Sequence, residues 1–351
     1  MAGESALAAG LTAVAVTPRL RRKIEKWIMQ SVPGAVRPYE LVFSPVRHNV
    51  LERAKRVSNY IESEANRGKG FNYLLSENGY VLKGRRKLME KQTANLIRQI
   101  IDGEINKKTV IENQAETPSA EFMTEIYLAA VKNNMGIRFI EEYTQKELKQ
   151  LDEWGRAADL QVALLKQQKG LMARLPCTRR WARCLGRIIN KRNARIIETM
   201  ATIMKEIKIE QKKKENVRCL VFSGPGHREV YHRALEKFRN ADITMANLPE
   251  ESTITLSLVQ KLGRKPTATI DQVYLARAVL ESALRGVYNL FVSKGEIDLA
   301  NHLEKRIASV TMDEFNVLEK LAKDRPYKET NKVLYEYFVG ERFKERLRRL
   351  K

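Results

Sequence analysis

Cysteine and histidine are both scarce in this chain of 351 residues, which has three cysteines and four histidines. The three cysteines are Cys177, Cys184 and Cys219. No two of them form a CxxC pair, and an odd number cannot all be paired in disulfides. A disulfide framework is therefore not indicated. Unpaired cysteines of this kind are typical of a reducing compartment, so we expect a cytoplasmic protein.

Long hydrophobic runs are also missing. The apolar stretch SALAAGLTAVAVTP near the start is shorter than a membrane span. Its basic cluster RLRRK follows it, whereas a signal peptide carries its positive charges first. We therefore expect residues 1–38 to form a loose arm or a short helix, and we expect no transmembrane segment.

Two common catalytic signatures are absent. Ser44 and Ser223 each lie close to a histidine, but neither sits in the G-x-S-x-G elbow of a serine hydrolase. The segment Gly224-Pro225-Gly226 precedes a helical pattern and can bind an anion, but no Walker lysine follows it. Serine hydrolysis and P-loop nucleotide chemistry are thus not favoured.

Positive charge, in contrast, is abundant. The chain has 64 lysines and arginines against 42 acidic residues, a formal net charge of +22. This balance favours nucleic acid, anionic membrane or phosphorylated ligands, or else reflects a solvated helical surface. The run RLPCTRRWARCLGRIINKRNARI, residues 174–196, has eight basic residues, no acid, and Trp181. It is suited to RNA by phosphate contact and stacking, or it is a basic helix packed over an acidic site.

Short apolar segments alternate with amphipathic ones over the first two thirds of the chain. Strands are expected in YELVFS, TVIENQ, GIRFIEE, NVRCLVFS and DITMANLP, which begin at residues 39, 109, 136, 216 and 242. Helices are expected between them, with residues 144–215 helical almost throughout and broken near Pro176. Such alternation predicts an α/β fold with a parallel-type sheet and long helical insertions. Only helices are expected after Ser252, so the predicted domains are an arm (1–38), an α/β core (39–251) and an all-helical C-terminal extension (252–351).

The phrase LVFS occurs twice, and a histidine follows at the same offset each time: His48 after the first copy and His227 after the second. In a parallel sheet, ligands bind outside the carboxyl ends of the strands, so both histidines are expected at that edge. Imidazole is a common metal ligand and a general base. Either histidine alone is explained by a hydrogen bond to a neighbouring loop, but two in matching contexts favour a site.

Four further groups are candidates for the same site. Glu112 lies at the end of the expected strand TVIEN, and a carboxylate beside two imidazoles suits a metal or acid/base cluster. A glutamate at a strand end is usually a solvated loop residue or a helix cap. Arg192, followed by Asn193, can hold a carboxylate or a developing oxyanion. Gly224 and Gly226 permit a tight turn and close approach of a ligand to the backbone.

These residues together resemble the TraB, TIKI, GumN and erythromycin-esterase/ChaN-like superfamily over roughly residues 39–248. The resemblance rests on the strand-end His48, the Glu112 segment, Lys-Arg-Asn at 191–193, and Gly-x-x-His at 224–227. It implies two Gly-x-x-His motifs, a glutamate and an Arg-Asn pair gathered at one edge of a pseudo-symmetric α/β core. The first motif departs from the pattern, because Pro45 replaces its glycine and Arg47 precedes the histidine.

The resulting hypothesis is a hydrolase of a peptide, ester or related bond in a peptide or small-molecule substrate. It would use a divalent metal ion held by His48, His227 and Glu112, with Arg192 and Asn193 assisting in catalysis. The alternative is a non-catalytic protein that binds nucleic acid or another polyanion through its basic helices. The sequence predicts neither the oligomeric state nor the identity of the metal.

Overall fold

A computed structural model describes most of the chain beyond the N-terminal arm. The described residues are 39–45, 51–77, 81–112, 117–211, 217–246, 254–293 and 296–350. By its contacts the chain divides into Met1–Pro38 and one compact unit, Tyr39–Lys351. The predicted arm and His48 lie outside the described residues, as does the predicted boundary after residue 251, which stays a prediction.

One sheet of five parallel strands forms the centre of this unit, in the order β3-β2-β4-β1-β5. The strands are β1 (Tyr39–Pro45), β2 (Tyr73–Ser76), β3 (Gly136–Phe139), β4 (Val217–Ser223) and β5 (Ala241–Met245). The two LVFS segments lie on adjacent strands, with Ser44 paired with Phe222 and Pro45 with Ser223. The predicted α/β fold with a parallel sheet is confirmed.

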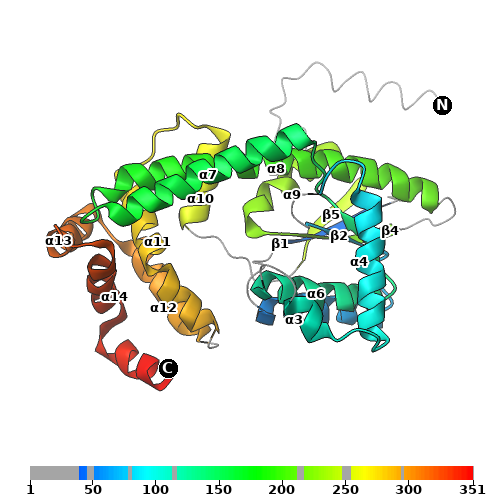
Figure 1. Cartoon of the computed structure of the whole chain (residues 1–351), viewed down its shortest axis with the longest axis horizontal. Helices are drawn as coiled ribbons and strands as arrows, with labels where there is room; N and C mark the ends of the chain where they lie inside the picture. Colours follow the sequence, from blue (N-terminus) through cyan, green and yellow to red (C-terminus); the bar gives the residue numbers. More distant parts are fainter. Residues whose placement is uncertain are drawn as a thin grey trace, which may run out of the picture. The chain divides into compact units, whose positions relative to one another are not determined.

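Helices cover both faces of the sheet, because its strands are apolar on both sides (Figure 1). Val42, Leu74 and Leu220 pack in one cluster with the helices α3 and α6 on one face. On the other face, α8 and α9 pack against alternate residues of the same strands. These helices are α3 (Leu51–Asn66), α6 (Thr117–Lys132), α8 (Arg174–Glu210) and α9 (Arg228–Lys237).

The connections change face where the strand order reverses. The chain moves from β1 to β2 and β3 through helices on the first face, then returns to β4 and β5 through helices on the second. This is the doubly wound arrangement that right-handed crossovers produce. β2 and β4 are neighbours in the sheet, but the chain leaves them toward opposite faces. Open α/β sheets bind ligands where the connections of neighbouring strands diverge in this way.

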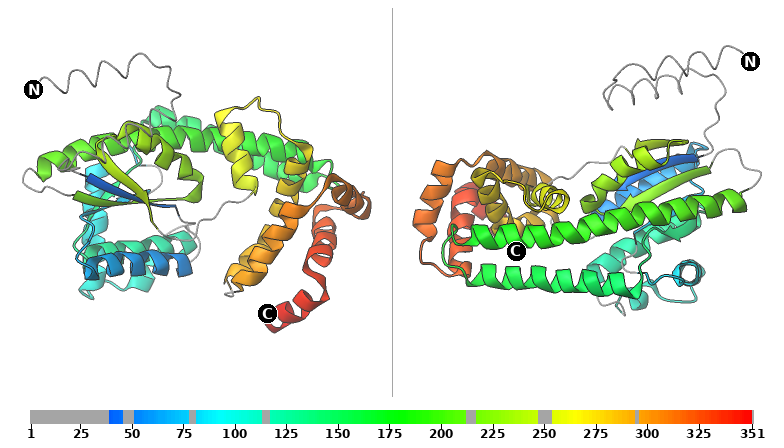
Figure 2. Two further views of the ribbon diagram at one scale, coloured as in Figure 1. Left: turned by 180° about the vertical axis from the view of Figure 1, so that it is seen from behind. Right: turned by 90° about the horizontal axis from the view of Figure 1, so that it is seen from above.

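A long helical hairpin connects β3 to β4. It consists of α7 (Gln145–Gln167) and α8, which run side by side (Figure 2). Thr144 and Glu147 form a capping box that starts α7. Pro176 lies in the first turn of α8, where a missing backbone N–H costs little. With 37 residues, α8 is about 55 Å long.

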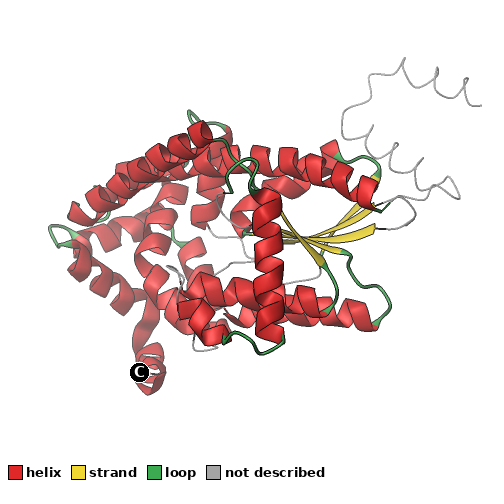
Figure 3. Cartoon of the chain, turned by 45° about the vertical axis from the view of Figure 1, so that its right-hand side comes forward, coloured by secondary structure: helices red, strands yellow, loops and turns green. Residues whose placement is uncertain are grey.

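Helices alone follow β5 in the described part of the chain (Figure 3). They are α10 (Ile254–Arg264), α11 (Gln272–Ser293), α12 (Ile297–Ser309), α13 (Met312–Ala322) and α14 (Tyr327–Leu350). They share a core with the first half of α8, including Leu175 and Ala182. Thr311 caps α13, accepting a hydrogen bond from the Glu314 N–H. Within the described residues, no helix is long and apolar enough to cross a membrane.

One predicted strand does not form, and one strand was missed. The described part of TVIENQ, Thr109 to Glu112, is not a strand, since Lys107–Glu112 form the short helix α5. The strand β2 was not predicted, although it lies next to the central strand β4. The long helix α8 begins at Arg174, so Arg192 lies in its middle.

Candidate functional site

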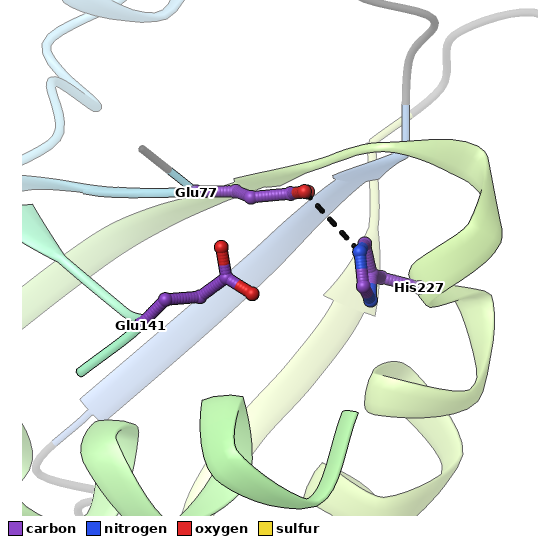
Figure 4. Close-up of side chains that lie close together, drawn as sticks. All are labelled: Glu77, Glu141 and His227. Atoms are coloured by element: carbon purple, nitrogen blue, oxygen red, sulfur yellow. Dashed lines mark ion pairs between the residues drawn. The ribbon is translucent and has the colours of Figure 1, made fainter. Parts of the chain in front are cut away.

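Three buried side chains meet at the carboxyl edge of the sheet. Glu77 directly follows β2, Glu141 lies two residues beyond β3, and His227 ends the 3₁₀ turn η1 (Pro225–His227) after β4. Because β3, β2 and β4 are neighbours, their following residues arrive at the same place (Figure 4). One ligand atom from each residue lies within 4.8 Å of those of the other two.

Backbone hydrogen bonds fix the loop that carries Glu77. Its N–H donates to the carbonyl of Phe222 (3.0 Å), so pairing with β4 continues past the end of β2. Its carboxylate in turn accepts a hydrogen bond from the N–H of Gly224 (2.8 Å). The turn after β4 and the residue after β2 therefore hold each other in place.

Arg192 bridges the carboxylates of Glu77 and Glu141. Its guanidinium makes a two-pronged contact with Glu141, Nε to Oε1 at 2.7 Å and Nη2 to Oε2 at 2.8 Å, and Nη2 also donates to Glu77. Burial alone would lower the pKa of Arg192, but the two carboxylates outweigh it and raise that pKa well above its usual value. The arginine therefore stays charged.

Tyr143 completes the surroundings of Glu141. Its hydroxyl is fully buried and donates to Glu141 Oε1 at 2.7 Å. Burial and the negative charge of Glu141 both raise the pKa of Tyr143 above its usual range, so the phenol stays protonated. Glu141 thus accepts hydrogen bonds from two different side chains although its side chain has no exposed surface.

His227 is oriented by Asn193, the residue after Arg192 on α8. The ring Nδ1 contacts Asn193 Oδ1, and Nε2 lies 3.2 Å from Glu77 Oε1. An amide oxygen and a carboxylate oxygen are both acceptors only. A neutral imidazole has one N–H, so it can satisfy only one of these two acceptors, and the lone pair of its second nitrogen faces the other.

The other basic residues of this part of α8 have partners of their own. Lys191 and Arg195 both pair with Glu147, the capping residue of α7. Burial raises the pKa of Glu147, but hydrogen bonds from the Thr144 backbone and from these cations outweigh it, and the pKa falls to about 2. Of the three cations Lys191, Arg192 and Arg195, it is Arg192 that pairs with the buried carboxylates of Glu77 and Glu141.

The structure brings together most of the residues predicted from the sequence. Arg192, Asn193, His227 and Gly224 lie in one cluster, and Gly226 packs so closely that an added Cβ would be 3.2 Å from Ile189. Glu112 is not part of it. Glu112 lies on α5 and is exposed, and its Oε1 is 3.7 Å from Lys108 Nζ. Its expected place at a strand end depended on a strand that does not form.

Glu77 and Glu141 were not predicted as site residues. Each has a recognisable signal, because each follows a short apolar strand, in YLLSE and in GIRFIEE. The second strand was predicted but its glutamate was not singled out. The first strand was not predicted, so the glutamate at its end was not considered.

The basic run 174–196 is largely packed against other helices. Arg174 is fully buried, and Arg179 is half-buried and donates to the Ala268 carbonyl at 3.1 Å. Arg180 and Arg187 are exposed. Nucleic-acid binding by this run stays a prediction, with fewer free cations than the sequence suggests.

Fold and site together define a doubly wound α/β protein with a buried, charged centre at the ends of three adjacent strands. No protein-family profile matches the chain, and neither a curated protein nor a solved structure matches it. The resemblance to the TraB and TIKI-like superfamily therefore rests on the sequence motifs alone.

Proposed function

We propose that the chain is a metal-dependent hydrolase whose divalent ion is held by Glu77, Glu141 and His227. The observation that supports this most directly is the cluster of three buried ligand atoms within 4.8 Å of one another. One imidazole and two carboxylates are a ligand set that Zn²⁺ and similar ions accept in catalytic sites.

The contacts of His227 fit a cation at its Nε2. Asn193 Oδ1 takes the Nδ1–H, which leaves the Nε2 lone pair directed at Glu77 Oε1. A cation shared by Nε2 and Glu77 would relieve this contact between two acceptors. Metal-bound histidines typically donate their other N–H to a fixed acceptor, and Asn193 occupies that position.

The charge balance also supports an ion and an anionic reaction centre. With a neutral imidazole, Glu77, Glu141 and Arg192 carry one net negative charge, which a divalent ion would convert into one net positive charge. A bound ion would polarise a scissile carbonyl and lower the pKa of a bound water toward about 7. Arg192, the most exposed of the charged groups at 17%, would stabilise the developing oxyanion.

Metal content tests the proposal. The full chain, purified without chelators, is analysed by mass spectrometry of the metals as wild type, His227→Ala and His232→Ala. His232 is an exposed histidine on α9 and serves as the matched control. We expect about one ion per chain in the wild type and the control, and a large loss in His227→Ala.

Hydrolysis of a peptide and ester library, measured before chelation and after re-addition of Zn²⁺ or Mn²⁺, should follow the metal content. Circular dichroism of each variant establishes that the fold persists. Equal metal content in His227→Ala and wild type, or none in either after incubation with these ions, would refute the proposed site.

A further inference from the structure

A second possible ligand site lies beside the edge strand β3, away from the charged centre. A cleft of about 440 Å³ is formed between α4 (Arg86–Ile101), the first residues of β3 and the end of α8. Figure 1 shows α4 running beside the sheet between the levels of α8 and α6. Ligand pockets for small molecules typically have volumes of about 300–1,000 Å³, so the cleft has room for one.

The floor and the walls of the cleft differ in chemistry. Met135 and Ile137 are buried and apolar, and Val131 and Ala94 add further apolar surface. Charged side chains of both signs surround this floor. Nine of the fourteen lining residues carry charged or amide side chains, so the cleft combines a small apolar surface with a strongly polar border.

The acidic groups of the cleft are already neutralised. Glu206 makes a two-pronged contact with Arg86, both distances 2.8 Å, and Glu90 accepts from Arg86 at 2.9 Å. Glu210 pairs with Arg138 at 2.8 Å. These carboxylates are unavailable to a ligand cation without breaking an existing ion pair.

Two cations of the cleft are not neutralised in this way. Lys91 and Arg98 have no carboxylate partner in the described part of the chain, and Arg98 contacts only the side-chain oxygen of Asn95 at 3.2 Å. Both project from α4, seven residues or about two turns apart, with Asn95 between them. The excess charge at the cleft is therefore positive and lies on one wall.

We propose that this cleft binds a small organic anion, an apolar body carrying a phosphate or carboxylate group that Lys91 and Arg98 recognise. Both groups accept charge-assisted hydrogen bonds from lysine and arginine. None of the lining residues belongs to the metal centre, and Glu206 follows Arg192 on α8 by 14 residues, about 21 Å along the helix. The site is thus independent of the proposed hydrolase centre.

Isothermal titration calorimetry of the full chain tests the proposal with phenyl phosphate, benzoate, inorganic phosphate and uncharged phenol. Phenyl phosphate or benzoate should bind more tightly than phenol, and the tighter of the two identifies the acidic group. The affinity should fall with rising salt, because screening weakens contacts between exposed charges.

Variants show whether binding occurs in the cleft. K91Q/R98Q should weaken binding of the preferred anion at least about tenfold, since two charge-assisted hydrogen bonds are lost. The control K55Q/R56Q removes the same charge from exposed positions of α3 and should leave the affinity unchanged. Ala94→Trp should abolish binding by filling the cleft while all charges remain.

Three results would overturn the proposal: no binding of either aromatic anion, phenol binding as tightly as both, or equal weakening by K91Q/R98Q and K55Q/R56Q. The last result would show a response to net charge alone. Circular dichroism and the metal content of each variant establish that loss of binding does not come from unfolding.

Discussion

Arg192 is the residue on which the charge balance of the centre depends. It contacts two carboxylates that are almost completely buried, and its flat guanidinium reaches both oxygens of Glu141 at once. Removing one partner of a buried ion pair leaves an uncompensated charge in a medium of low dielectric constant. Arg192 therefore has a structural role in addition to any catalytic one.

The variant Arg192→Lys tests whether the guanidinium geometry, and not only the positive charge, stabilises the fold. Lysine keeps the positive charge but cannot bridge Glu77 and make the two-pronged contact with Glu141 together. We expect the free energy of unfolding to fall by about 1–3 kcal/mol, measured by urea denaturation. Arg156→Lys, which alters an exposed pair with Asp152, is the control and should leave the midpoint unchanged. Equal midpoints for the two variants would contradict the structural role.

The residues of the centre differed in how well the sequence predicted them. Arg192, Asn193 and His227 belong to short motifs whose local pattern is visible without the fold. Glu77 and Glu141 belong to no such motif and become neighbours only because β2 and β3 are paired. Glutamate is common on charged surfaces. The sequence does not show that Glu77 and Glu141 are buried, and their burial is what marks them as site residues.

Short elements explain the errors in secondary structure. The strand β2 has four residues, YLLS, all buried and therefore without the alternation that marks a half-exposed strand. The β-branched residues of TVIENQ favoured a strand by propensity, but the segment forms one short helix after Asn106, whose side chain accepts from the Lys108 N–H. The longer helices were predictable because their periodic pattern extends over several turns.

Glycine determines how closely α8 and α10 approach. A Cβ added to Gly186 would lie 2.4 Å from the Val259 carbonyl oxygen, and one added to Gly263 would lie 2.4 Å from the Gly186 oxygen. These are backbone atoms, so no side-chain rotation can relieve the contact. The two helices can pack at this distance only because both residues lack a side chain.

Gly186→Ala should accordingly destabilise the protein, although alanine favours helices. We expect a loss of about 1–3 kcal/mol in the free energy of unfolding, because the helices must move apart. Gly155→Ala on α7 is the matched control, since its added Cβ meets nothing within 4 Å. That change should stabilise the protein by up to about 1 kcal/mol. A stabilising Gly186→Ala would mean that the close crossing does not form.

At the scale of the whole molecule, α8 connects two hydrophobic cores. Its first half contributes Leu175 and Ala182 to the core of the C-terminal helices, and its second half contributes Ile196 and Met200 to the core under the sheet. Each core stabilises the half of the helix that it contacts. Loss of either core should therefore weaken the other.

Two tryptophans allow the coupling between the C-terminal core and the small cluster next to the charged centre to be measured. Trp181 packs against the core of the C-terminal helices, and Trp154 packs near Tyr143 and Ile188. With Trp27 replaced by phenylalanine, the variants W154F and W181F each leave one of these reporters. We expect the urea midpoints from both fluorescence signals and from far-ultraviolet circular dichroism to coincide, as in a single cooperative transition. A difference above about 0.5 M would show that the C-terminal core and the cluster around Trp154 unfold separately.

The position of β4 in the sheet has a consequence for synthesis. This strand lies between β1 and β2 and pairs with both, yet it follows β1, β2 and β3 in the chain. His227 is translated 150 residues after Glu77, which takes about 8 to 30 s at about 5–20 residues per second. A ribosome therefore carries both glutamates before the strand that separates β1 from β2 exists. β1 and β2 therefore cannot reach their final places in the sheet until β4 has been made. The charged centre can assemble only after that.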